Sequence, residues 1–153
     1  MAEVTNRRFL GNEKGAQLVE FALVLPLLLL VILGIAEFGF MFQRYEVLTN
    51  AAREGARIAV LPGYANQDVE ARVAAYLDAG RVPTTAGNPV VTVTTEPLVV
   101  PGGTTITMRR VTVTYTYTYM FLNAIAGWFG AAYTTQQLSA VSEMRVEIAV
   151  AGA

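Results

Sequence analysis

The sequence predicts an α+β protein: a long, pilin-like N-terminal transmembrane α-helix, then a small domain with a three- to four-stranded antiparallel sheet and short helices. Three observations predict this fold. An apolar run near the N-terminus is long enough to cross a membrane, a short amphipathic helical segment follows it, and apolar and polar side chains then alternate with the period of strands. The 153 residues have room for one domain beside a membrane helix.

The composition also indicates a membrane protein. Hydrophobic residues make up 54% of the chain and charged residues only 15%, and the mean hydropathy of +0.43 is too apolar for an ordinary soluble domain. The net charge of −1 provides no field that would hold nucleic acid. The chain has no Cys and no His, which removes thiolate nucleophiles, imidazole bases and almost every zinc site. We therefore expect no enzymatic activity, no metal or other cofactor and no nucleic-acid partner.

The apolar run extends without interruption over residues 21–36 and resumes after Glu37. A helix over residues 21–42 measures about 33 Å, which matches the roughly 30 Å thickness of a hydrocarbon core. Glu20 and Glu37 flank the first run, so one helix places them near opposite interfaces, where charges cost least. We expect a transmembrane segment at about 21–42.

Two other interpretations of this run are disfavoured. The small residues of Gly34-Ile35-Ala36 would suit secretory cleavage before Glu37, but the run is long and continues apolar beyond that point. A buried helix of a soluble protein would need more chain to cover it than is present. Basic residues are equally frequent on both sides of the run, so charge alone leaves the orientation open.

Little interrupts helical periodicity from residue 16 to residue 61. Pro26 removes one backbone hydrogen bond and predicts a local kink. Beyond the membrane segment, small side chains recur at helical spacing on one face. They are Ala52, Gly55, Ala56 and Ala59. Such a stripe allows close packing, and we favour packing within the chain's own domain over packing against neighbouring subunits.

The segment before the run carries a more specific pattern: a short charged leader ends at Gly15, and Glu20-Phe21 opens the apolar helix. This resembles the cleavage site of type IV prepilins, in particular of their tight-adherence (Tad) branch. The resemblance implies that prepilin peptidase cuts between Gly15 and Ala16, leaving residues 1–15 as the leader. It also implies that Glu20 pairs with the new amino terminus of its own or a neighbouring chain, because a carboxylate at the edge of lipid needs a partner.

Downstream segments sharpen this resemblance. Glu37-Phe38-Gly39, residues 50–59 and residues 142–147 look like the corresponding parts of the TadE-like family, whereas residues 64–107 show little similarity. The Asp-x-Ser-x-Ser metal-site motif of the larger TadG relatives is absent from the sequence.

The resemblance implies a minor pilin or pseudopilin in a bacterial cytoplasmic (inner) membrane, with its C-terminal domain outside the cytoplasm. Its implied partners are prepilin peptidase, other Tad pilins or pseudopilins, inner-membrane assembly proteins and the lipid bilayer. Its implied role is in pilus assembly and adhesion. A single-pass anchored binding module that never enters a fibre is the alternative. A major fibre subunit is disfavoured, because those chains are much shorter in that family.

The remaining residues, 62–153, form the expected extracytoplasmic domain. A short helix beginning near Asn66 or Asp68 and ending before Gly80 is followed by a loop at 84–89 and a turn at 101–103. Alternating patterns predict strands near residues 91–94, 111–119 and 143–150.

Two aromatic groups in this domain allow a structural and a functional interpretation. Tyr115, Tyr117 and Tyr119 line one face of the second strand, and without a basic groove a core position is favoured over a stacking or sugar-binding surface. An aromatic lobe at 121–132 has one helical apolar face. We favour core packing of this lobe over contact with a membrane or another pilin.

Overall fold

A computed structural model describes residues 13–85, 87–103, 105–128, 130–131 and 135–146. Its elements are, in chain order, α1 (Glu13–Ala59), α2 (Asn66–Ala79), β1 (Val90–Val99), β2 (Thr105–Thr118), α3 (Phe121–Trp128) and β3 (Thr135–Arg145). The predicted α+β fold is therefore confirmed.

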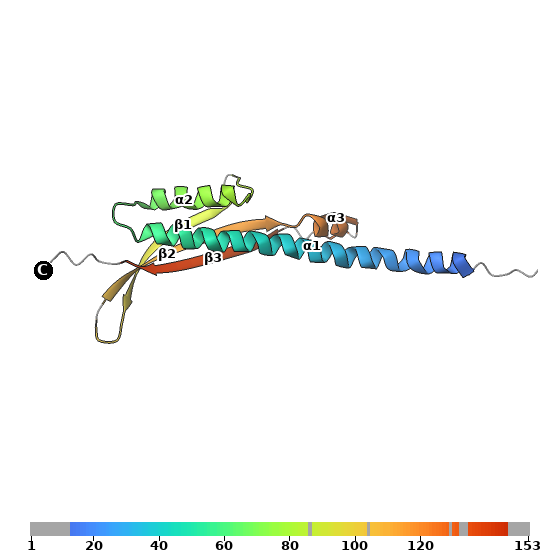
Figure 1. The fold of residues 1–153 in the computed structure, drawn as a ribbon, viewed down its shortest axis with the longest axis horizontal. Coiled ribbons are helices and arrows are strands. Elements are labelled where there is room, and N and C mark those ends of the chain that lie inside the picture. Colours follow the sequence, from blue (N-terminus) through green and yellow to red (C-terminus); the bar gives the residue numbers. More distant parts are fainter. Residues whose placement is uncertain (1–12, 86, 104, 129, 132–134, 147–153) are drawn as a thin grey trace, which may run out of the picture.

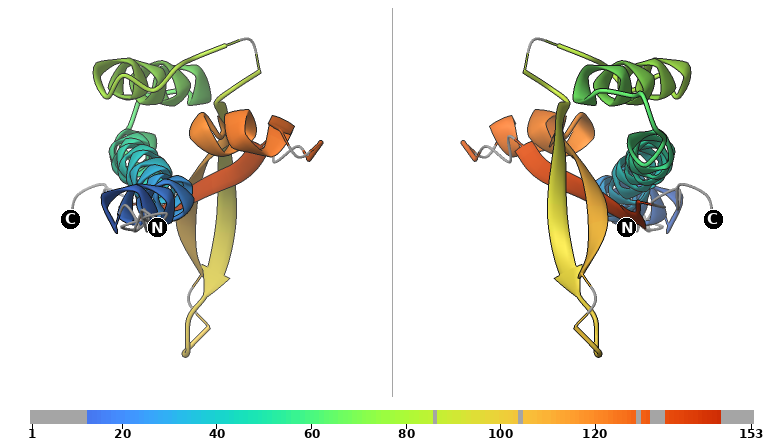
Figure 2. Two further views of the ribbon diagram at one scale, coloured as in Figure 1. Left: turned by 90° about the vertical axis from the view of Figure 1, so that its right-hand side faces the viewer. Right: turned by 90° about the vertical axis from the view of Figure 1, so that its left-hand side faces the viewer.

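The long helix α1 forms the axis of the molecule (Figure 1). Its C-terminal half lies along the sheet beside α2, and its N-terminal half projects beyond the domain. Both α1 and α2 lie on the same side of the sheet (Figure 2). One helix thus belongs to two environments, the domain core and the surface beyond it.

The described strands form one antiparallel sheet in the order β1-β2-β3. Val93 of β1 and Ser142 of β3 both pair with Val111 of the central strand. Side chains alternate between the two faces of a strand. The buried side chains of β2 are odd-numbered, from Val111 to Tyr117, so the odd-numbered face of β2 lies toward the helices. The period-two pattern of β2 therefore predicted its buried face correctly.

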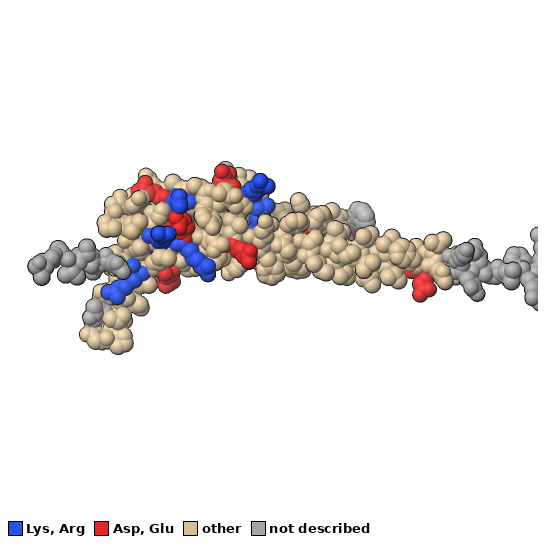
Figure 3. Space-filling view, viewed as in Figure 1, with Lys and Arg blue, Asp and Glu red and all other residues tan. Residues whose placement is uncertain are grey.

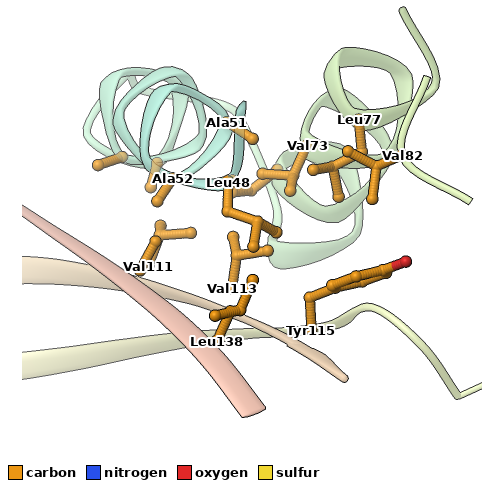
Figure 4. Close-up of a cluster of buried hydrophobic side chains, with 14 of the residues drawn as sticks. Leu48, Ala51, Ala52, Val73, Leu77, Val82, Val111, Val113, Tyr115 and Leu138 are labelled. Carbon is orange, nitrogen blue, oxygen red and sulfur yellow. The ribbon is translucent and has the colours of Figure 1, made fainter. Parts of the chain in front are cut away.

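The core fills the space between the two helices and this face of the sheet (Figure 4). Its main buried side chains come from four elements and are Leu48, Ala51, Ala52 and Ala56 of α1, Val69, Val73 and Leu77 of α2, Val111, Val113, Tyr115 and Tyr117 of β2, and Leu138 and Ala140 of β3. Tyr115 and Tyr117 are only 6% and 7% exposed, which confirms the core position expected for them.

The small residues of α1 allow α2 and the sheet to approach the helix closely. A Cβ atom on Gly55 would lie 2.6 Å from Cγ2 of Val73 and 3.2 Å from Cγ1 of Val111. Ala52 and Ala56 are fully buried in the same core. This face of α1 therefore packs within its own domain, with no room for a larger side chain.

Several element boundaries differ from those expected. The helix α1 ends at Ala59 rather than at 61, and β1 continues to Val99. Asp68 caps the start of α2, because its carboxylate accepts a hydrogen bond from the Ala65 N–H at 2.8 Å. The side-chain oxygen of Asn66 instead accepts a hydrogen bond from the guanidinium of Arg109.

The third strand lies earlier than the prediction over 143–150. It begins at Thr135 and pairs with the length of β2 from Thr118 to Met108. Its first half has only Leu138 and Ala140 facing the core, which is a weak alternation in sequence. Residues 147–150 of the predicted strand lie outside the described residues.

The packing at Gly55 yields a stability prediction. Gly55→Leu forces a side chain into the methyl groups of Val73 and Val111, and we expect the domain to lose about 1–3 kcal/mol of unfolding free energy. For a domain of this size each kcal/mol lowers Tm by about 4–8 °C, measured by thermal unfolding in detergent. Gly39→Leu is the matched control on α1, because no atom lies within 4 Å of its Cβ position. An equal Tm for the two variants would contradict the packing.

Candidate membrane anchor and its junction with the domain

The N-terminal half of α1 is apolar on every side and is covered by little of its own chain. Among the described helices α1 is long and apolar enough to cross a membrane, and its most apolar part is not buried within the molecule. Large hydrophobic side chains such as Leu23, Leu27 and Ile35 are 65–76% exposed. A surface of this size requires lipid or other apolar helices around it.

The residues of the predicted cleavage motif lie at the start of this helix. Gly15, Ala16 and Glu20 all lie within α1, and Ala16, Glu20 and Phe21 are exposed. The first twelve residues of the predicted leader lie outside the described part of the chain. α1 continues as a helix through Pro26.

Charged partners within the described residues lie in the domain, far along the chain from Glu20. Glu54 pairs with Arg72 at 2.7 Å, and Arg110 pairs with Glu96 and Glu143 on the sheet. No ion pair of the described residues involves Glu20. Glu20 is exposed at the surface of the helix.

Glu37 has a different environment, because its side chain is fully buried. One carboxylate oxygen accepts the hydroxyl of Tyr117 at 2.8 Å, and the backbone N–H of Met120 lies 3.0 Å from both oxygens. The second oxygen also accepts the N–H groups of Phe121 and Leu122, at 2.5 and 3.3 Å. One carboxylate from α1 thus binds the end of β2 and the start of α3.

These contacts make Glu37 the N-terminal cap of α3. The first N–H groups of a helix have no partner within the helix, and a carboxylate satisfies them and interacts favourably with the helix dipole. The cap is unusual in coming from a residue more than 80 positions earlier in the chain. It fixes α3 against α1.

Aromatic groups surround the carboxylate. Burial, together with the hydrogen bond to Glu37, raises the pKa of the Tyr117 hydroxyl, which therefore remains a protonated donor at neutral pH. The Tyr117 ring packs edge-on against Tyr119 at 5.6 Å, and Phe40 of α1 lies 6.5 Å from Phe121 of α3. Aromatic side chains thus lie beside a carboxylate whose two oxygens both accept hydrogen bonds.

This junction adds to one sequence-based expectation and revises another. Glu37, expected near a membrane interface, is covered by α3 and β2, and its place relative to a membrane stays a prediction. The aromatic lobe was expected in the core, but it packs on α1 beyond the end of the sheet, with Phe121 and Ile125 only half-buried. Glu37 belongs to a family-like motif, yet its partners are too distant in sequence for spacing to indicate them. Phe129 and Ala132 of the lobe lie outside the described residues.

A cavity of about 430 Å³ opens beside the junction. It is bounded by Phe40 and Arg44 of α1, by the loop after α2 and by the end of β2. Arg44 donates to the carbonyl oxygen of Arg81, and both side-chain amide atoms of Asn88 bond the backbone of Thr116. Its described lining combines the guanidinium of Arg44 with the phenol rings of Tyr115 and Tyr117.

These features define a class of protein: a single-pass membrane protein whose long helix α1 is apolar and exposed in its first half and packed on an antiparallel sheet in its second. The family model of TadE-like proteins matches residues 15–57. The TadE-like resemblance is therefore confirmed over the helix that carries the cleavage motif, Glu20 and Glu37. No curated protein and no solved structure matches the chain.

The Glu37 cap can be tested by a nearly isosteric change. Glu37→Gln leaves one acceptor oxygen and places an amide NH2 against backbone donors, so we expect a loss of about 1.5–3 kcal/mol in unfolding free energy. Hydrogen exchange of the backbone amides at 120–122 should accelerate. Glu46→Gln, at an exposed position on the same helix, is the control and should change neither quantity. Unchanged exchange at 120–122 in Glu37→Gln would refute the cap.

Proposed function

We propose that this protein is a minor pilin or pseudopilin of a Tad pilus system, made as a prepilin in the inner membrane of a bacterium. The observation that carries the proposal is the TadE-like match, which begins at Gly15 and covers the lipid-exposed half of α1. Prepilin peptidase would cut after Gly15, and the domain would lie outside the cytoplasm. The role is structural, in pilus assembly and adhesion.

The mechanism proposed for assembly rests on the surface of α1. An apolar helix exchanges lipid for the similar helices of other Tad pilins at little cost, because both surroundings are apolar. Inner-membrane assembly proteins would drive this transfer out of the bilayer.

Cleavage would leave the new amino group of Ala16 at one end of this helix. Ala16 and Glu20 are four residues apart and therefore lie on the same face of α1. The exposed Glu20 carboxylate can then pair with that amino group in its own chain or in a neighbouring one. This pairing would offset two charges that leave the interface for an apolar fibre interior.

One observation favours an anchored binding module as the second candidate. The cavity lined by Arg44 would serve a protein that stays in the membrane and binds a ligand. Fractionation separates the two functions: a pilin is recovered with sheared fibres or assembly proteins, whereas an anchored module stays in the membrane and keeps residues 1–15.

Processing is tested with protein from membranes that contain prepilin peptidase. The intact mass and N-terminal sequence should show a wild-type chain that begins at Ala16. Gly15→Leu should retain the leader, because the protease requires a backbone it can approach without a side chain. Gly34→Leu, deeper in the same helix, should be cut normally. Normal cleavage of Gly15→Leu, or a wild-type chain beginning at Glu37, would rule out the prepilin assignment.

The role of Glu20 is tested separately from membrane insertion. Glu20→Ala should remain in the carbonate-washed membrane, since removing a charge favours lipid, but its recovery with fibres or assembly proteins should fall about tenfold if the pair contributes about 1.4 kcal/mol. Gln17→Ala, an exposed polar residue one turn earlier, is the control. Wild-type incorporation of Glu20→Ala would remove the terminal-amine role and leave the cleavage assignment standing.

A further inference from the structure

The position of α3 relative to α1 bears on how the protein contacts its membrane. α3 lies past the end of the sheet, on the side of the domain from which the N-terminal half of α1 projects (Figure 1). Its contacts on α1 include Glu37 and Phe40. Both residues lie within the segment 21–42, which has the length of a bilayer crossing. α3 is therefore beside the membrane segment and not above it.

α3 and the strand segments that flank it carry no charged side chain. From residue 111 to residue 142 the sequence contains no Asp, Glu, Lys or Arg. In the face shown in Figure 3, charged side chains gather over the domain, including the C-terminal half of α1, while the stretch of α1 just beyond the domain shows none. Exposed apolar side chains lie on both sides of the junction, with Met120 66% exposed, and Phe38 and Phe42 49% and 61% exposed. The apolar surface of α1 thus continues onto α3.

Backbone groups at both ends of α3 have partners within the protein. At the start, Glu37 accepts the N–H groups of residues 120–122. At the end, Ala131 N–H donates to the Ala126 carbonyl and Gly130 N–H to the Gly127 carbonyl, with Gly130 at a φ of +68°. This is the hydrogen-bond pattern of a Schellman motif. Unpaired backbone groups normally exclude short helices from lipid, and these bonds reduce their number at both ends of this eight-residue helix.

We propose that α3 is embedded in the bilayer that α1 spans, in the leaflet on the domain side. The occupant of its half-exposed face, which includes Phe121, Leu122 and Ile125, is lipid. The exposed apolar surface that continues from α1 onto α3 and the bonded backbone groups at both helix ends support this choice over a second protein chain. The proposal requires only that α1 crosses a membrane; it depends on neither leader cleavage nor entry into a fibre.

The only tryptophan of the chain, Trp128, lies in α3 and reports its surroundings without any substitution. Full-length protein is placed in phosphatidylcholine vesicles whose acyl chains are brominated either near the headgroup or near the methyl end. We expect bromine near the headgroup to lower Trp128 fluorescence about twofold or more, and deep bromine to lower it less, as for a helix at the boundary between headgroups and acyl chains.

Two control variants carry a single tryptophan elsewhere. Trp128→Phe with Tyr76→Trp moves the reporter to α2 in the domain and should abolish quenching, whereas Trp128→Phe with Phe21→Trp places it on the membrane helix and should keep it. Trp128 unquenched by either lipid while the Phe21 reporter is quenched would overturn the proposal, because α3 would then be covered by protein or held in water. That outcome would leave membrane spanning by α1, and the pilin assignment, intact.

Discussion

The arrangement of this molecule depends on one buried carboxylate. Glu37 lies in the long apolar helix α1, where an unpaired buried charge would be severely destabilising. Its hydrogen bonds to a tyrosine hydroxyl and to the backbone at the start of α3 make it tolerable, and they also hold β2 and α3 against α1. The electrostatic requirement of one side chain therefore determines where the domain meets the membrane helix.

A second constraint operates farther along the same helix. Where α1 leaves the apolar surroundings of its first half, alanine and glycine replace leucine and valine, and the domain packs directly on the helix backbone. Large side chains in the first half maximise contact with lipid, and small ones in the second half allow a sheet and a helix to approach. The change in side-chain size along α1 thus divides one uninterrupted helix into an anchor and a core element.

The sequence predicts the regular parts of this fold well. The apolar run, the amphipathic face of α2 and the alternation in β2 each depend on periodicity over neighbouring residues, and each is found where it was expected. The start of β3 was missed, because Leu138 and Ala140 alone provide too little alternation. The junction could not be predicted, because the partners of Glu37 are brought to it by the return of β2, and nothing near Glu37 in sequence indicates a contact with residues 117–122. The cleavage site is a prediction from resemblance and not from a physical pattern.

The continuity of α1 has a mechanical consequence. No flexible linker separates the lipid-exposed half from the half in the core, and the Glu37 bonds provide a second attachment between the two parts. A rotation of the domain about the helix axis is therefore transmitted to the membrane segment as torque rather than absorbed at a hinge. The face of the helix that is presented inside the bilayer is then determined by whatever the domain contacts outside it.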